Sequence, residues 1–165
     1  MIIVSDTTPL SELAKVGKLN LLHDIYGKII IPQEVYHEVT TGTTGTHPAV
    51  NLVQLADWIE RRTISSSEKV STLKTITNLG WGECAAMILA EELEADQLLI
   101  DDLEARRVAL SRNFKITGTL GILLVAKQLG LITSVQEVLE ALITQGKRIN
   151  PRLYQEVLST AQESL

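Results

Sequence analysis

Cysteine is almost absent from this sequence, which has one, Cys84, in 165 residues. A single thiol cannot form a disulfide within the chain, and it excludes a zinc site built from several cysteines. The N-terminal residues lack the basic segment and cleavage site of a signal peptide, so we expect none. A reducing compartment fits this composition, and the predicted location is cytoplasmic.

Long apolar runs and nucleotide-binding glycine loops are missing as well. No apolar run approaches the roughly 20 residues of a membrane-spanning helix, so we expect no membrane partner. Neither a G-x-x-x-x-G-K-[ST] nor a G-x-G-x-x-G pattern occurs, which excludes the two common phosphate-binding loops. The three histidines, His23, His37 and His47, show no zinc-ligand spacing.

Positive charge is in deficit, because the net charge is −5 and the isoelectric point about 5.2. This balance excludes a protein that coats nucleic acid by bulk electrostatic attraction. It does not exclude a nuclease, because bound cations reverse the local sign of an acidic pocket. Several basic residues also follow the pair Asp101-Asp102, namely Arg106, Arg107, Arg112, Lys115 and Lys127.

Short β-branched runs alternate with helical patterns, which is typical of an α/β fold with a mostly parallel sheet. The length fits one domain. Strands are predicted at residues 1–5, 28–31, 58–64, 97–100 and 114–116, the third at an edge of the sheet. Helices are predicted at 8–22 with a break near Gly17, from Pro32 through Glu38, and at 50–56, 66–76, 84–94, 103–111, 118–129, 134–143 and 151–162. Residues 40–48, rich in Thr and Gly, are predicted to form a loop.

Four acidic residues stand where these predicted strands and helices begin or end: Asp6, Glu38, Glu83 and Asp102. In open α/β sheets ligands bind outside the carboxyl ends of the strands, so Asp6 and Asp102 are expected to face one another. Crowded carboxylates repel unless a cation or hydrogen bonds compensate them, and Mg2+ or Mn2+ is the ion that such oxygen ligands favour. We expect Asp6, Glu83 and Asp102 to share a cation directly or through waters, with Glu38 at the rim.

Each acid also has a structural interpretation. Asp6 can cap the first helix, although Thr8, followed by Pro9, is better placed to do so. Asp101 fits a capping box with Glu104, so one aspartate of the pair can be structural.

The same holds for the other candidate residues. Glu38 can be a solvated residue near a helix end, and Glu83 in a first turn is favoured by the helix dipole. Cys84 fits an inert core position. Trp58 and Trp81 fit packing positions better than base-stacking platforms.

With the acids placed, the chain resembles the PIN-domain ribonucleases, a group that includes VapC-type toxins. The first motif corresponds to Val4-Ser5-Asp6-Thr7-Thr8, and the second to Ile31 through Glu38. The third and fourth correspond to Gly82 through Ala86 and to Ala95 through Asp102. The match runs in order from about residue 2 to residue 131, and residues 118–132 resemble a PIN-like subfamily.

This resemblance implies a three-layer α/β/α fold with a central mostly parallel sheet and C-terminal helices. A catalytic domain would span residues 1–131, and residues 132–165 would form a helical extension packed on the same domain. The implied activity is an endoribonuclease that hydrolyses RNA with Mg2+ or Mn2+. The implied catalytic residues are Asp6, Glu38, Glu83 and Asp102. The implied metal ligands are Asp6, Glu83, Asp102 and Asp101, and the implied substrate contacts are Thr8, Arg106 and Arg107.

The sequence departs from the family pattern at two places. Many PIN domains have Thr-Asn-Asp where this chain has Ile100-Asp101-Asp102, and the register favours Asp102 as the ligand. Many also have a further Asp where this chain has Thr117-Gly118-Thr119. Thr117 or Thr119 can hold a metal-bound water instead, and the number of metal ions, one or two, stays open.

Three classes of function follow. The first is a metal-dependent ribonuclease, which the resemblance extends to the toxin of a toxin-antitoxin pair with a small antitoxin protein and a homodimeric state. The second is a degenerate PIN-like module that binds RNA or protein without cleaving. The third is a phosphotransfer protein that uses Asp6 as phosphate acceptor. Thr8 stands where a haloacid-dehalogenase-like phosphatase needs a second Asp, and a receiver domain needs the reverse order of acids.

Overall fold

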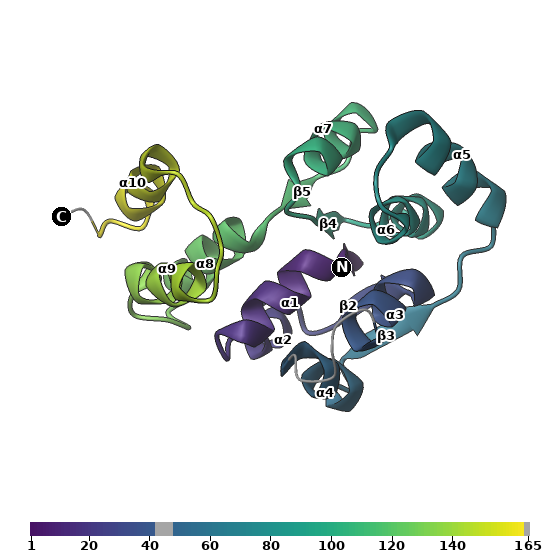
Figure 1. Ribbon diagram of the computed structural model, residues 1–165. Helices are drawn as coiled ribbons and strands as arrows, with labels where there is room; N and C mark the ends of the chain where they lie inside the picture. The colour runs from purple at the N-terminus through teal and green to yellow at the C-terminus, as the bar shows by residue number, and fades with distance from the viewer. Residues whose placement is uncertain (42–47, 164–165) are drawn as a thin grey trace.

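A parallel β-sheet forms the centre of the molecule (Figure 1). The computed structural model describes residues 1–41 and 48–163, and within them five strands pair in the order β3-β2-β1-β4-β5. The strands are β1 (Ile3–Ser5), β2 (Ile29–Pro32), β3 (Ile59–Arg62), β4 (Gln97–Leu99) and β5 (Ile116–Thr117). All four pairings are parallel, which confirms the predicted sheet.

The strand sequences explain this order. The central strands β1 and β2 are buried along their whole length, as expected for β-branched strands covered on both faces. In contrast, β3 reads Ile-Glu-Arg-Arg and its two arginines are exposed, which confirms its predicted edge position. The edge therefore carries charged side chains, which discourage pairing with another chain.

Helices cover both faces and give three layers, α/β/α. They are α1 (Thr7–Lys15), α2 (Asn20–Tyr26), α3 (Gln33–Thr41), α4 (Pro48–Leu55), α5 (Ser67–Thr77), α6 (Trp81–Glu92), α7 (Leu103–Ser111), α8 (Thr119–Gln128), α9 (Val135–Thr144) and α10 (Pro151–Thr160). From β1 to β2 the chain moves toward the β3 edge of the sheet, and from β3 to β4 it moves back toward the β5 edge. Right-handed crossovers therefore place α2, which contacts β2, and α6, which contacts β1, β2 and β4, on opposite faces.

Several helix boundaries differ from the prediction, and two of these differences lie close to the acids. The first helix begins at Thr7, with Asp6 as the preceding residue, so Thr8 lies inside the first turn and is not its cap. At the predicted loop, Thr40 and Thr41 still belong to α3 and α4 begins at Pro48, whereas 42–47 lie outside the described residues. Capping preference predicts the first of these boundaries, and the Thr- and Gly-rich composition of residues 40–48 predicts the second.

The C-terminal helices α9 and α10 pack on α8, at the left of Figure 1. Their buried apolar residues recur at helical spacing and include Val135, Leu139, Leu142 and Leu158. The Ser134 hydroxyl accepts a hydrogen bond from the Glu137 N–H, which confirms the predicted cap of α9. Among the residues that the structure describes, no helix is both long and apolar enough to cross a membrane.

The Glu163 carboxylate ties these helices together. It accepts hydrogen bonds from the backbone N–H groups of Val135 (2.7 Å) and Gln136 (3.0 Å) at the start of α9. It also pairs with Lys127 of α8 at 2.8 Å. Burial acts to raise the pKa of Glu163, but the bonds from Lys127, Gln136 and Val135 hold it at about 2.

We predict that Glu163→Gln lowers the free energy of unfolding by about 1–3 kcal/mol near pH 7, because it weakens charge-assisted hydrogen bonds to a helix start. The folded pKa of Glu163 lies below the ordinary value of 4.5. The contribution of Glu163 to the free energy of unfolding is therefore complete above pH 4.5 and is lost as the pH falls toward 2. Urea unfolding at several pH values measures both effects.

The matched control is Glu156→Gln, because Glu156 is exposed and pairs only with Arg152 on the same helix among the described side chains. We expect this control to change stability by less than about 0.5 kcal/mol. Equal destabilisation by the two substitutions would contradict the role given to Glu163.

Candidate active site

The candidate site lies where the strand order reverses, between β1 and β4. The chain builds outward from β1 to β2 and β3 on one side, and from β4 to β5 on the other. Helices following β1 and β4 therefore leave on opposite faces, and a crevice forms at the carboxyl ends of these two strands. Asp6 directly follows β1 and its N–H donates to the Leu99 carbonyl at 2.9 Å. This adjacency confirms that Asp6 and the Asp101-Asp102 pair lie at neighbouring strand ends.

Asp6 is the most unusual residue of the site. It is only 3% exposed, and its Oδ1 atom has no hydrogen-bond partner among the described residues. Burial raises its pKa to about 7; the Thr7 backbone N–H opposes this rise, and the charges of Glu83, Glu38 and Asp101 add to it. A buried carboxylate oxygen without a partner is costly, and such groups concentrate where a ligand or a proton is handled.

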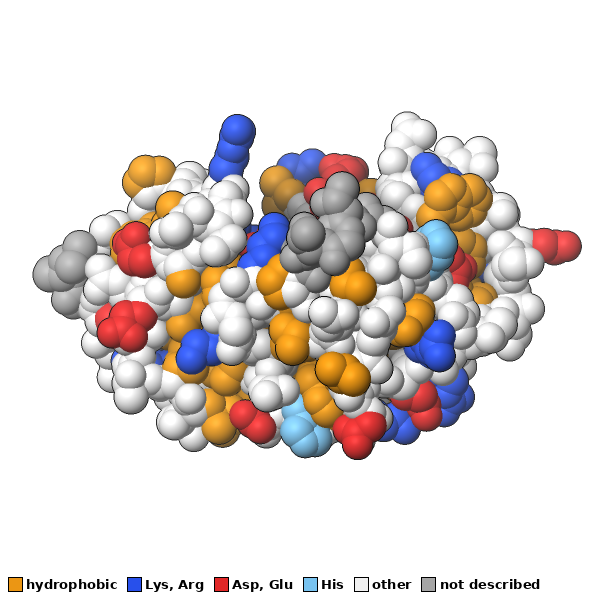
Figure 2. Space-filling view, turned by 60° about the horizontal axis from the view of Figure 1, so that its bottom comes forward, with side chains coloured by type: hydrophobic (Ala, Val, Ile, Leu, Met, Phe, Trp, Pro, Cys, Tyr) orange, Lys and Arg blue, Asp and Glu red, His pale blue; other side chains and the backbone are white. Residues whose placement is uncertain are grey.

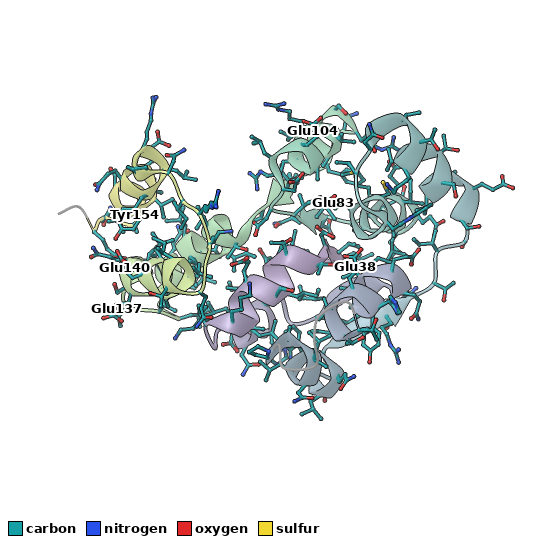
Figure 3. All side chains as sticks on the ribbon, in the orientation of Figure 1. Glu38, Glu83, Glu104, Glu137, Glu140 and Tyr154 are labelled. Carbon is teal, nitrogen blue, oxygen red and sulfur yellow. The ribbon has the colours of Figure 1, made fainter. Side chains whose placement is uncertain are left out.

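Glu38 bridges two helices beside Asp6. Its Oε2 accepts a hydrogen bond from the Thr7 hydroxyl at 2.7 Å, and its Oε1 accepts one from the Gly82 N–H at 3.0 Å. A Cβ atom at Gly82 would lie 2.6 Å from the Glu38 carboxylate, so only glycine allows this approach. In Figure 3, Glu38 on α3 and Glu83 at the start of α6 border the same region, whereas Glu104 lies away from them on α7.

Glu83 combines a structural contact with a charged environment. Its Oε1 accepts the Gly80 N–H at 2.9 Å, which satisfies a free donor at the start of α6. Burial raises the pKa of Glu83, the Gly80 bond opposes the rise, and the charges of Asp102 and Glu38 add to it. One oxygen of Glu83 thus has a structural role at the helix start. The carboxylate also experiences the repulsion expected of an acid in the site.

The two aspartates after β4 have different surroundings. Asp102 caps α7 by accepting the Ala105 N–H at 3.0 Å, so the predicted cap of this helix is the second aspartate and not Asp101. Asp101 instead accepts the backbone N–H and the hydroxyl of Thr119, both at 2.6 Å. A Cβ atom at Gly118 would lie 2.7 Å from the Asp101 carboxylate, so this contact requires glycine. Asp102 is exposed and keeps one oxygen free among the described contacts.

The predicted substrate contacts occupy three kinds of position. Thr8 is half-buried in the first turn of α1. Arg106 is half-buried and donates to the Ile100 carbonyl at 3.1 Å. Arg107 is exposed and pairs with Glu104 at 3.2 Å. Of the two arginines, Arg106 therefore lies on the side of the site.

Sequence reasoning missed two residues that the fold brings here. Thr7 binds Glu38, and Lys147 lies 3.7 Å from Asp101. The family resemblance implies Thr8 as the hydroxyl residue of the first motif, but it is the neighbouring Thr7 that contacts Glu38. No local signal identifies Lys147, because it follows a helix far along the chain.

A hard divalent cation fits the chemistry of the group in part. All candidate ligands are carboxylates, and the Asp6 Oδ1 atom is buried without a partner. However, within residues 1–41 and 48–163 no three His, Cys, Asp or Glu side chains converge to hold one ion directly. Glu38, Glu83 and Asp102 each direct an oxygen to a backbone N–H instead. These side-chain positions do not form a direct three-acid site, and sharing of a cation through waters stays a prediction.

Of the remaining candidates, Cys84 and Trp58 have structural surroundings, whereas the packing position predicted for Trp81 is wrong because this side chain is exposed. Cys84 is buried. Trp58 stacks on His23 with ring centroids 5.3 Å apart, while Trp81 is 52% exposed. Figure 2 shows positive and negative side chains interspersed over one face, without an extended basic surface on that face.

The comparison with protein-family models finds a match to the model DUF3368, described as a PIN domain, over residues 2–163. No curated protein and no solved structure matches the chain significantly.

We predict that Asp6→Asn removes a pH dependence of stability. Between pH 3.8 and about 7 the unfolded chain loses the Asp6 proton while the folded protein retains it. The free energy of unfolding of the wild type therefore falls as the pH rises through this window. In EDTA near pH 8 the variant should be more stable by on the order of 2 kcal/mol.

Urea unfolding of both proteins from about pH 4 to pH 8 measures this difference. Asp24→Asn on α2 is the matched control, since Asp24 is exposed. A variant that is less stable than wild type throughout, with the same pH dependence, would refute the account of Asp6.

Proposed function

Because the chain belongs to the PIN-domain family, which has a nuclease-type fold, we propose that it is a metal-dependent ribonuclease that hydrolyses RNA phosphodiesters. The observation that carries the proposal is Asp6, a buried carboxylate with an unpartnered oxygen at the switch point of the sheet. Its neighbours Glu38, Glu83 and Asp101 are all acids that raise its pKa. A fold that only needed stability would not retain this repulsion at one place.

Asp6, Glu38, Glu83 and Asp102 are the residues that would hold Mg2+ or Mn2+. When bound, such an ion supplies Lewis-acid stabilisation of charge on the phosphate. Three of these acids, Asp6, Glu83 and Asp102, keep an oxygen that makes no hydrogen bond within the described residues.

The hydrolysis itself needs a water that attacks phosphorus in line with the leaving oxygen. The new P–O bond forms as the ester P–O bond breaks, the water gives up a proton and the leaving oxygen takes one. A carboxylate of this acidic group is suited to accept the proton, because a positioned carboxylate can act as a general base. Thr7 and Gly82 hold the Glu38 carboxylate in a fixed orientation beside Asp6.

Asp102 is our choice of ligand from the pair. Both oxygens of Asp101 already accept hydrogen bonds from Thr119, and Lys147 compensates its charge. Asp102 uses one oxygen as a cap and contributes to the raised pKa of Glu83. Asp101 would then act by holding the start of α8 against the site.

A second function, binding of RNA or protein without cleavage, is favoured by two observations. The position after β5 carries Gly118 and Thr119 where many PIN domains have a further Asp. No direct three-acid metal centre is formed among the described side chains. The third class, phosphotransfer through Asp6, receives no support from the family match.

The partner predictions rest on the family resemblance, and the location prediction rests on the single cysteine and the N-terminal sequence. A small antitoxin protein, a second copy in a homodimer and a cytoplasmic location stay predictions. A short reading frame beside the gene, encoding a protein that blocks cleavage, would support the toxin assignment.

We predict that the wild type cleaves single-stranded or structured RNA in Mg2+ or Mn2+ and not in EDTA. Asp6→Asn should abolish this cleavage, because it removes a ligand at the centre of the acidic site. The metal should also raise the melting temperature of the wild type more than that of the variant. Asp24→Asn should behave as wild type in both measurements. RNA binding without cleavage in either metal would favour the second function.

We predict that Asp102→Asn lowers the rate of cleavage by roughly 100-fold or more and leaves stability within about 0.5 kcal/mol, because Asn still caps a helix. Asp102→Ala should lower the rate equally and also lose about 1 kcal/mol of stability. Asp101→Asn should cost less activity. Single-turnover cleavage and urea unfolding of the three variants test this, and wild-type cleavage by Asp102→Asn would move the ligand role to Asp101.

A further inference from the structure

Lys147 lies between α9 and α10 and reaches the edge of the acidic site. Its Nζ is 3.7 Å from the Asp101 Oδ2, and the two side chains are 17% and 13% exposed. Asp101 is one of the acids that raise the pKa of Asp6, so the ammonium lies next to the charged group. In Figure 1 the connection between α9 and α10 runs along the side of these helices that faces the sheet.

The backbone fixes the position of Lys147. Helix α9 ends in a left-handed glycine, Gly146, with φ +103°. The Gly146 N–H donates to the Ile143 carbonyl and the Lys147 N–H donates to the Leu142 carbonyl, both at 3.0 Å. These bonds are those of a glycine-terminated helix end, which redirects the chain sharply. This defined turn therefore sets the position of Lys147, and Leu142, which accepts its backbone hydrogen bond, is fully buried.

The ammonium of Lys147 has unused donor capacity. At 3.7 Å its contact with Asp101 is an ion pair but is too long for a hydrogen bond. Lys127 on α8 offers a contrast, since its ammonium donates to the Thr133 carbonyl at 2.9 Å and to Glu163 at 2.8 Å. Lys147 makes no side-chain hydrogen bond within the part of the chain that the structure describes. A largely buried ammonium with free donors is suited to an incoming anionic oxygen.

Asp101 does not need Lys147 as its structural partner. Both oxygens of Asp101 already accept hydrogen bonds from Thr119 at 2.6 Å. The ion pair instead holds a positive charge at the edge of a group that would otherwise repel a phosphate. It places that charge on the carboxyl-end side of β4, where substrate must approach the acids.

We propose that Lys147 binds a phosphate oxygen of the RNA backbone beside the cleaved bond, so that the C-terminal extension supplies part of the substrate site. This proposal rests on the proposed ribonuclease function. Lys147 is a substrate-binding residue in this account, and it neither donates nor accepts a proton.

The test measures binding of a fluorescently labelled single-stranded RNA in EDTA, where no metal-dependent cleavage occurs, over a series of KCl concentrations. Lys147→Gln should weaken binding by about tenfold and reduce the slope of log affinity against log salt by about 0.7, the value for one phosphate contact on a single strand. Lys147→Arg should restore most of both quantities. Arg152→Gln is the control of equal charge change, because Arg152 is 90% exposed and pairs with Glu156.

Thermal unfolding of each variant verifies folding. A purely structural role for Lys147 would change the melting temperature and leave the salt slope as in wild type. Equal slopes and affinities for wild type, Lys147→Gln and Arg152→Gln overturn the proposal, as does a wild type that binds no RNA in EDTA.

The outcome is separable from that for the proposed function. A wild type that never cleaves in Mg2+ or Mn2+, but loses binding and slope with Lys147→Gln, overturns the nuclease and supports the phosphate contact. A wild type that cleaves RNA, and whose RNA binding is unchanged by Lys147→Gln, supports the nuclease and overturns the phosphate contact.

Discussion

The structure of the site depends on the burial of one carboxylate, Asp6, at the point where the sheet reverses its direction. The residue sits between β1 and β4 with a single backbone bond from its N–H to Leu99, and its Oδ1 is unpartnered among the described residues. Burial and three neighbouring acids raise its pKa to about 7. The fold tolerates this charge because the surrounding β-strands and α6 bury enough apolar surface to offset it.

The other acids are tolerated for a different reason, which is that backbone N–H groups compensate them. Glu83 and Asp102 each accept a hydrogen bond from a backbone N–H group at a helix start, and Asp101 accepts one from the Thr119 N–H at the start of α8. The free donors of helix N-termini favour negative charge, so three helices that begin at one edge of the sheet partly compensate the acidic cluster. Glycines at 82 and 118 allow the close approach of Glu38 and Asp101.

The C-terminal helices are part of this arrangement. They are fixed to α8 by apolar packing and by Glu163, which links Lys127 to the start of α9. A rigid α9 in turn fixes the turn that carries Lys147. A distant helix pair thus supplies positive charge to a site whose acids all come from residues 6–102.

The sequence alone determined the parallel sheet, most helices and the positions of Asp6, Glu83 and Asp102 at the ends of elements, because each depends on residues close together in the chain. Glu38, predicted to end its helix, lies inside α3. Alternation of β-branched runs with helical periodicity is a local pattern, and so is an acid after a strand. Only the tertiary structure decided the partners of Glu38, since Thr7 and Gly82 are 31 and 44 residues away from it. The tertiary structure also decided the different contacts of Asp101 and Asp102 and the ion pair between Lys147 and Asp101. These contacts join different elements, and their geometry follows from how helices pack across the sheet, which no local preference encodes.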